Sequence, residues 1–102
     1  MTSVISTVST ALGVADWAVR ELRAGELTLE AEAAALPALA DRVVLGLDGR
    51  LMSLFASDER HATGRFVVHH VWSLPRHRTF LHIAAPIDPA DYNLDPLTFL
   101  EN

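Results

Sequence analysis

Apolar residues near the start of the chain follow the period of a helix. Between residues 4 and 22 they recur at steps of three and four, which predicts one helix over this range. The positions are Val4, Val8, Ala11, Ala15, Ala18 and Leu22. Arg20 and Arg23 lie in the last turn, where cations suit the helix dipole, and Gly25 is a typical stop. We expect Trp17 to pack from this helix onto a sheet.

The next segment, residues 26–34, alternates between apolar and polar side chains. Leu27 and Leu29 fall on one side, and Glu26, Thr28 and Glu30 fall on the other. A period of two predicts a strand with one solvated face. The alanines and glutamates of this segment favour a helix by their intrinsic propensity, so pattern and composition disagree here.

A second helix and three strands are predicted after this segment. Pro37 suits the first turn of a helix, and the apolar residues after it form one face. Residues 50–57 read as a strand, followed by a polar connection over 57–64. Residues 65–74 and 78–86 flank Pro75-Arg76-His77 and predict a β-hairpin. The apolar face of the helix consists of Leu36, Leu39, Ala40, Val43, Val44 and Leu47.

This order of elements predicts the fold class. A helix, a strand, a helix and three strands form a two-layer α+β domain, with two helices on one face of a mostly antiparallel sheet. We expect residues 1–86 to form this single domain. Residues 87–102 contain Pro89 and Pro96 and show little periodicity, which indicates an extended C-terminal tail.

Length and charge restrict the possible functions. A chain of 102 residues fits one domain with a modest core. Its net charge of -5 and its lack of a basic stripe argue against nucleic acid as a partner. No apolar run approaches the roughly 20 residues needed to cross a bilayer, so we expect no direct membrane insertion. The absence of cysteine excludes disulfides, thiolate metal sites and a cysteine nucleophile.

The five histidines are the first candidates for chemistry. His69 and His70 are adjacent on a predicted strand and point to opposite faces, so they cannot share a metal. If the hairpin is centred on Arg76, His70 lies opposite His82, with Cβ atoms about 5 Å apart. A metal needs at least one further ligand. We therefore expect no metal site, and interpret this pair as imidazoles on a partly solvated face or a subunit contact.

No other motif predicts catalysis. Asp58-Glu59-Arg60 could serve acid–base chemistry, but the sequence offers no nucleophile or oxyanion hole nearby, so a solvated strand end is favoured. The serines and threonines near the N-terminus read as helix caps and an exposed helix face. A Gly-x-Ser-x-Gly elbow, a phosphate-binding glycine loop and a His-Glu-x-x-His motif are all absent from the sequence. We expect no catalytic residue and no cofactor.

Both faces of the predicted hairpin are substantially apolar, which is the best functional hint from the residues themselves. Two helices can cover only one of these faces, so the other should be buried by a partner. We define the candidate partner surface as one predicted sheet face. Its residues are Phe66, His70, Trp72, Phe80 and His82.

Several segments resemble one protein family. They are Leu36-Pro37-Ala38-Leu39, Gly49-Arg50-Leu51, Ala56-Ser57-Asp58-Glu59-Arg60, the run from Phe66 to Pro75, and Ala85-Pro86-Ile87-Asp88-Pro89. The family that they resemble is the 30-kilodalton-type subunit of NADH:quinone oxidoreductase, which is respiratory complex I. The resemblance extends to the N-terminal domain of large subunits of formate hydrogenlyase and hydrogenase-4-type [NiFe] hydrogenases, and it covers roughly residues 26–98.

The resemblance implies a scaffold without cofactor that packs against the catalytic large subunit of an electron-transport complex. It also implies a cytoplasmic location, peripheral at the inner membrane through that complex. Asp95-Pro96-Leu97-Thr98 is similar to the approach to a family segment that this sequence does not contain. In isolation, such a domain could form a homodimer.

Two other functions remain open from the sequence. One is a small self-associating domain that binds a ligand on the face of His70, Trp72 and His82. The other, which the residues favour least, is an independent hydrolase or metal enzyme.

Overall fold

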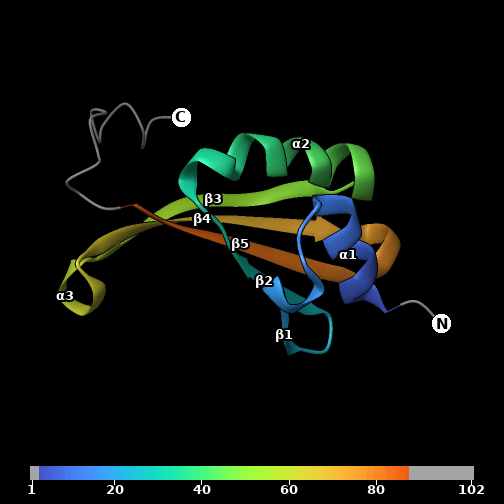
Figure 1. Cartoon of the computed structure of the whole chain (residues 1–102), viewed down its shortest axis with the longest axis horizontal. Coiled ribbons are helices and arrows are strands. Elements are labelled where there is room, and N and C mark those ends of the chain that lie inside the picture. Colours follow the sequence, from blue (N-terminus) through green and yellow to red (C-terminus); the bar gives the residue numbers. More distant parts are fainter. Residues whose placement is uncertain (1–2, 88–102) are drawn as a thin grey trace.

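The computed structural model describes residues 3–87 and shows an α+β fold, as the sequence predicts. Two main helices lie on one side of a five-stranded sheet (Figure 1). The elements are α1 (Val4–Leu12), η1 (Asp16–Ala18), β1 (Val19–Arg23), β2 (Glu26–Glu30), η2 (Ala33–Ala35), α2 (Leu36–Leu47), β3 (Arg50–Glu59), α3 (Arg60–Thr63), β4 (Arg65–Leu74), η3 (Pro75–His77) and β5 (Thr79–Ile87). The predicted C-terminal tail falls, from residue 88 onward, outside the described residues.

The strand order in the sheet is β1-β2-β5-β4-β3. Neighbouring strands are antiparallel except for β2 and β5, which are parallel. The chain makes this parallel pair by leaving β2 through α2 and building β3 and β4 before it returns in β5. The β1–β2 and β3–β4 pairs therefore lie at opposite ends of the sheet, joined through β5.

The prediction of one helix over residues 4–22 is wrong beyond Leu12. Gly13 adopts a left-handed conformation with φ of 73° and caps α1, with its N–H directed to the carbonyls of Ser9 and Thr10. A residue other than glycine is disfavoured in this conformation, so the helix ends here. The Ser9 hydroxyl bonds the Asp16 carboxylate and holds the segment that leads to β1.

Residues 19–23 are therefore a strand that the sequence reading missed. Gly25, with φ of 81°, forms the turn between β1 and β2 instead of stopping a helix. Trp17 is 84% exposed, so the expectation that it packs on the sheet is wrong. The predicted strand over residues 26–34 is confirmed for 26–30; it ends at Glu30, and η2 begins at Ala33.

The later elements lie close to their predicted ranges. Pro37 stands in the first turn of α2, and Asp48 ends that helix in a left-handed conformation. The strand predicted over 50–57 extends to Glu59, and the connection after it contains α3. Both hairpin strands are confirmed, with β5 beginning at Thr79.

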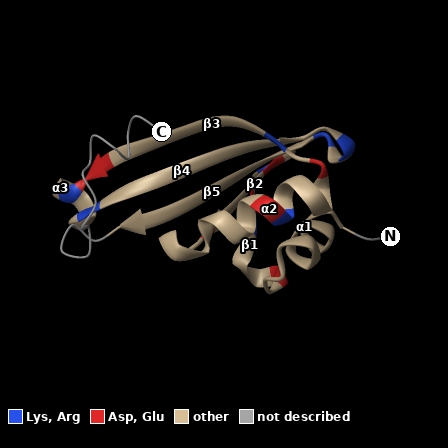
Figure 2. Cartoon of the chain, turned by 90° about the horizontal axis from the view of Figure 1, so that it is seen from above, with Lys and Arg blue, Asp and Glu red and all other residues tan. Residues whose placement is uncertain are grey.

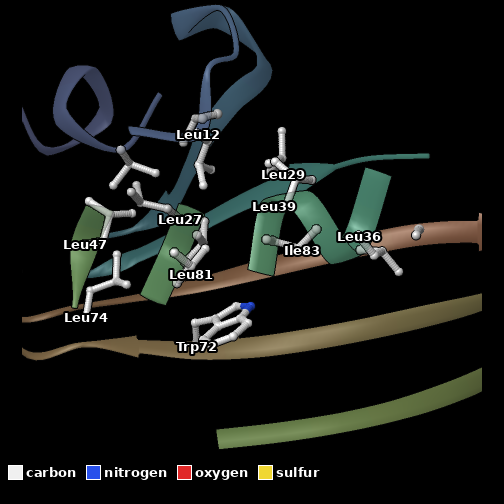
Figure 3. Close-up of a cluster of buried hydrophobic side chains, with 14 of the residues drawn as sticks. Leu12, Leu27, Leu29, Leu36, Leu39, Leu47, Trp72, Leu74, Leu81 and Ile83 are labelled. Atoms are coloured by element: carbon white, nitrogen blue, oxygen red, sulfur yellow. The ribbon is translucent and has the colours of Figure 1, made fainter. Parts of the chain in front are cut away.

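The hydrophobic core lies between the helices and one face of the sheet (Figure 3). Leu12 of α1 and Leu39 and Leu47 of α2 pack with Leu81 and Ile83 of β5. Arg42 of α2 donates to the carbonyl of Leu12 over 2.7 Å, which joins the two helices at the C-terminal end of α1. We call the sheet side that α1 and α2 cover the helix face, and the opposite side the open face.

Candidate partner-binding face

The register of the β4–β5 hairpin decides which side chains share a face. Leu74 pairs with Thr79, so the loop holds the four residues 75–78, and His70 lies opposite Ile83. His82 lies opposite Val71. The prediction that His70 opposes His82 is therefore wrong. It assumed a three-residue loop centred on Arg76, and a shift of one residue exchanges the faces of one strand relative to the other.

The structure does not bring the five residues of the candidate partner surface together. Trp72 is 4% exposed and belongs to the core on the helix face. Phe66 and His70 alternate with it on β4, and so point to the same side. Phe80 and His82 alternate with buried Leu81 and lie on the open face. The surface predicted as one patch is therefore divided between the two sides of the sheet.

His69, which the sequence reading set aside, is the residue that meets His82. The Nδ1 atom of His69 lies 2.7 Å from Nε2 of His82, and the two rings are stacked with centroids 5.0 Å apart. His69 pairs with Ala84 and His82 with Val71, so the imidazoles are diagonal neighbours on the open face. Diagonal positions on adjacent strands are within reach of aromatic side chains. The correct hairpin register would have predicted this contact.

A line of polar contacts continues from this pair across four strands. Nδ1 of His82 lies 3.5 Å from the Thr28 hydroxyl on β2. On the other side, Nε2 of His69 lies 2.8 Å from the Ser57 hydroxyl on β3. That hydroxyl donates to Oε2 of Glu59 over 2.6 Å. We call these five residues the polar line: Thr28, His82, His69, Ser57 and Glu59.

One arrangement of protons satisfies every contact in the polar line with both rings neutral. Because Ser57 donates to the Glu59 carboxylate, it must accept from Nε2–H of His69. Nδ1 of His69 then accepts from Nε2–H of His82, and Nδ1 of His82 accepts from Thr28. In this arrangement Ser57 donates to a carboxylate and not to an imidazole, so His69 does not activate it as a nucleophile.

Burial affects the protonation of the hairpin histidines. Desolvation lowers the pKa of His82, and the neighbouring charge of His69 lowers it further. Desolvation also lowers the pKa of His70 on the helix face. Nδ1 of His70 and Nε1 of Trp72 are buried without a hydrogen-bond partner among the described residues. Both environments therefore favour neutral imidazole over imidazolium.

The charged cluster at the end of β3 is divided as well. Asp58 receives two hydrogen bonds from the Arg60 guanidinium, at 2.8 and 2.9 Å, and these lower its pKa to about 2. Glu59 instead reaches Ser57 and lies 3.8 Å from Nε2 of His69. The two carboxylates thus have separate partners and do not form an acid–base pair.

Apolar side chains flank the polar line. Phe55 stacks on His69 with ring centroids 4.6 Å apart. At the other end of the open face, a shallow groove of about 400 Å³ is lined by Leu22 of β1, Val71 of β4 and Phe80 of β5, together with His82. An apolar surface with a few placed polar groups has the composition of a binding face.

The described part of the chain offers little else for chemistry. Residues 3–87 contain no group of three or more histidine, aspartate or glutamate side chains placed to hold a metal ion. None of the helices in that range is long and apolar enough to cross a membrane. In comparisons with known proteins, no family model and no curated protein matches the chain.

Proposed function

We infer that the chain is a non-catalytic docking domain of an electron-transfer complex. In this proposal it packs against the catalytic large subunit of a complex I-like NADH:quinone oxidoreductase or a formate hydrogenlyase-type hydrogenase. The redox chemistry belongs to that large subunit, and the location is cytoplasmic, peripheral at the inner membrane through the complex. The choice of partner rests on the resemblance of residues 26–98 to the 30-kilodalton-type subunit of complex I.

The open face is the observation that carries the docking proposal. It combines the apolar side chains Phe55, Val71 and Phe80 with hydrogen-bonding groups that have fixed partners. Phe80 lies on the central strand β5 near the hairpin loop and is 49% exposed, so a large aromatic side chain is left partly in water. A partner that covers this face would bury apolar area without breaking the polar line, since the hydroxyls and ring nitrogens of that line are already paired.

The test is purification of the tagged chain from its native host in mild detergent, with mass spectrometry of the proteins that accompany it. We expect a complex I-type or [NiFe]-type large subunit in stoichiometric amount. Phe80→Glu should reduce its recovery about tenfold, because a carboxylate would be buried without a partner. Leu45→Glu is the matched control, since Leu45 is 86% exposed on α2 and away from the open face.

The outcomes distinguish a wrong function from a wrong contact surface. If neither type of large subunit accompanies the natural chain, the proposed function is wrong. If the large subunit accompanies the Phe80→Glu variant undiminished, and circular dichroism shows the variant folded, the function stands and the contact lies on another surface. Equal loss in Phe80→Glu and Leu45→Glu would also argue against a specific open-face contact.

The groove on the open face supports a second candidate, a small self-associating domain that binds a ligand. Its volume of about 400 Å³ falls within the range of ligand pockets, and His82 and Glu26 supply polar groups at its rim. The probe is the fluorescent apolar anion 1-anilinonaphthalene-8-sulfonate. Saturable binding at one site per chain, weakened by Phe80→Ser and unaffected by Leu45→Ser, would support this candidate. Non-saturable binding would count against it.

A further inference from the structure

Strand β3 is an open edge of the sheet. Among residues 3–87 it pairs with β4 on one side only, because it is last in the strand order. Its ten residues include four large apolar side chains that are 44–61% exposed: Leu51, Met52, Leu54 and Phe55. An edge of this length normally carries lysine or proline along it to prevent pairing with other chains. Between Leu51 and Ser57 this strand has no charged residue and no proline.

The helices do not protect this end of the sheet. Figure 2 shows α1 and α2 over the β1–β2 end, while β3 and most of β4 extend clear of them. Leu51 and Leu54 pair with Trp72 and His70, so they lie on the helix face, yet about half of each side chain is exposed. Side chains on both sides of β3 are thus largely exposed, and no other strand among the described residues pairs with its outer edge.

The charges on β3 stand only at its ends and have opposite signs. The strand begins at Arg50 and ends with Asp58 and Glu59, as the blue and red ends in Figure 2 show. If two copies of β3 paired in parallel, like charges would meet at each end. If they pair antiparallel about a two-fold axis, the basic end of each copy meets the acidic end of the other. The charge pattern therefore favours antiparallel self-pairing.

One pairing register places opposite charges across from each other and keeps them on the same side of the sheet. The β3–β4 pairing shifts between Leu51 and Ser53, which makes Met52 an extra residue outside the alternation. If Met52 is left out of the alternation, Arg50 and Glu59 each lie four steps along the strand from Phe55. A two-fold axis at Phe55 then sets Arg50 opposite Glu59 of the second copy. It also sets Leu54 opposite Ala56, and Ser53 opposite Ser57.

In this register the side chains of Arg50 and Glu59 lie on the same side of the sheet. Glu59 bonds Ser57, whose hydroxyl contacts His69, so both lie on the open face. Arg50 pairs with Ser73, and Ser73 pairs with Phe80 of the open face, so Arg50 lies on that side as well. The two charged groups could therefore meet without crossing the sheet. Asp58 pairs with Phe66 on the helix face and is held by Arg60, which leaves Glu59 as the carboxylate for Arg50.

We propose that β3 is a homodimer interface, in which two copies pair antiparallel about Phe55 and form one ten-stranded sheet. The occupant of the edge is a second copy of this chain, because the charges and the register complement themselves. The two-fold axis is perpendicular to the sheet, so both open faces lie on the same side. This interface rests on the edge of β3 and not on the proposed function, although the side chain of Phe55 also lies on the open face.

Disulfide trapping tests the register directly. The sequence has no cysteine, so Phe55→Cys introduces one thiol per chain. At a paired position on the axis, the two Cα atoms would lie about 4.5–5.5 Å apart, within the range for a disulfide. Under mild oxidation of the full chain we expect a covalent dimer to form at least about tenfold faster than in Leu45→Cys, which reports random collision. Equal rates in the two variants would overturn the proposal.

Charge reversal supplies an independent test by sedimentation velocity. Arg50→Glu and Glu59→Arg each place like charges opposite one another at both ends of the interface, and each should weaken self-association about tenfold. Mixed in equal amounts, the two variants restore both opposite-charge pairs, so a heterodimer should form about as tightly as the natural dimer. Its formation also shows that both variants fold.

Three results would contradict the interface. One is a natural chain that stays monomeric throughout the concentration series. Another is a dimer that Arg50→Glu and Glu59→Arg do not weaken. The third is a mixture of these variants that does not reassociate. A monomeric chain that gains a strand only from another protein would assign the β3 edge to that protein instead. None of these results would alter the co-purification test of the proposed function.

Discussion

The two faces of the β4–β5 hairpin both carry apolar residues but bury them to different extents and by different means. On the helix face, Leu81 and Ile83 have no exposed surface and pack against the helices. On the open face, Phe80 remains about half exposed, and His69 and His82 are held by hydrogen bonds and ring stacking. The comparison teaches that one face stabilises the fold by excluding water, while the other keeps a specific geometry next to water.

The largest expected effect comes from the helix face. Leu81→Ala removes a fully buried side chain from the core, and we expect it to lower the free energy of unfolding by about 2–5 kcal/mol. Phe80→Ala, one residue away on the open face, should cost no more than about 1 kcal/mol. Urea denaturation of both variants measures the difference. Equal losses would mean that the two faces are buried alike.

Breaking the polar line should have an intermediate effect. His69→Ala removes the contacts to His82 and Ser57 and the stacking of Phe55, and we expect a loss of about 1–2 kcal/mol in unfolding free energy. His61→Ala on the exposed helix α3 is the matched control. A His69→Ala variant as stable as the control would show that the line contributes no net stability.

The protons of the polar line give a sharper test. Nitrogen-15 NMR should show His69 and His82 both in the Nε2–H tautomer at neutral pH. This follows because each Nδ1 atom accepts a hydrogen bond in the arrangement that satisfies all five residues. An Nδ1–H tautomer at either ring would reverse the direction of the line and would make Ser57 a donor to His69.

A smaller effect is expected from pH. Burial lowers the pKa of His70 and His82 below the ordinary value of 6.5, so below that pH the unfolded chain binds more protons than the folded chain. Stability should therefore fall as the pH is lowered from 7.5 to 5.5. The combined His70→Gln and His82→Gln variant should lose less stability over this range. An unchanged pH dependence in that variant would assign the effect to other groups.

The smallest effect should come from Trp17. It is 84% exposed and stands outside both faces, so Trp17→Ala should change the free energy of unfolding by less than about 0.5 kcal/mol. Thermal unfolding followed by circular dichroism measures this change. A loss comparable to that of Leu81→Ala would mean that Trp17 packs in solution as the sequence pattern indicates.

The sequence by itself determined the elements whose apolar runs lie between clear turn or loop residues. These are α2 and the strands β3, β4 and β5, and with them the α+β class with helices on one face. The reason is local: a period of two or 3.6 records which side of an element is buried. The same reasoning failed at Gly13, because the apolar spacing continued past a residue whose left-handed conformation ended the helix.

Only the tertiary structure decided which side chains meet. The extra residue in the hairpin loop moved His82 away from His70 and next to His69. The parallel pairing of β2 with β5 brought Thr28 into the same line, although the two partners are 54 residues apart in the chain. Such contacts depend on loop length and on strand order across the sheet. Neither leaves a periodic trace in the sequence, so the candidate site became visible only once the strands were in register.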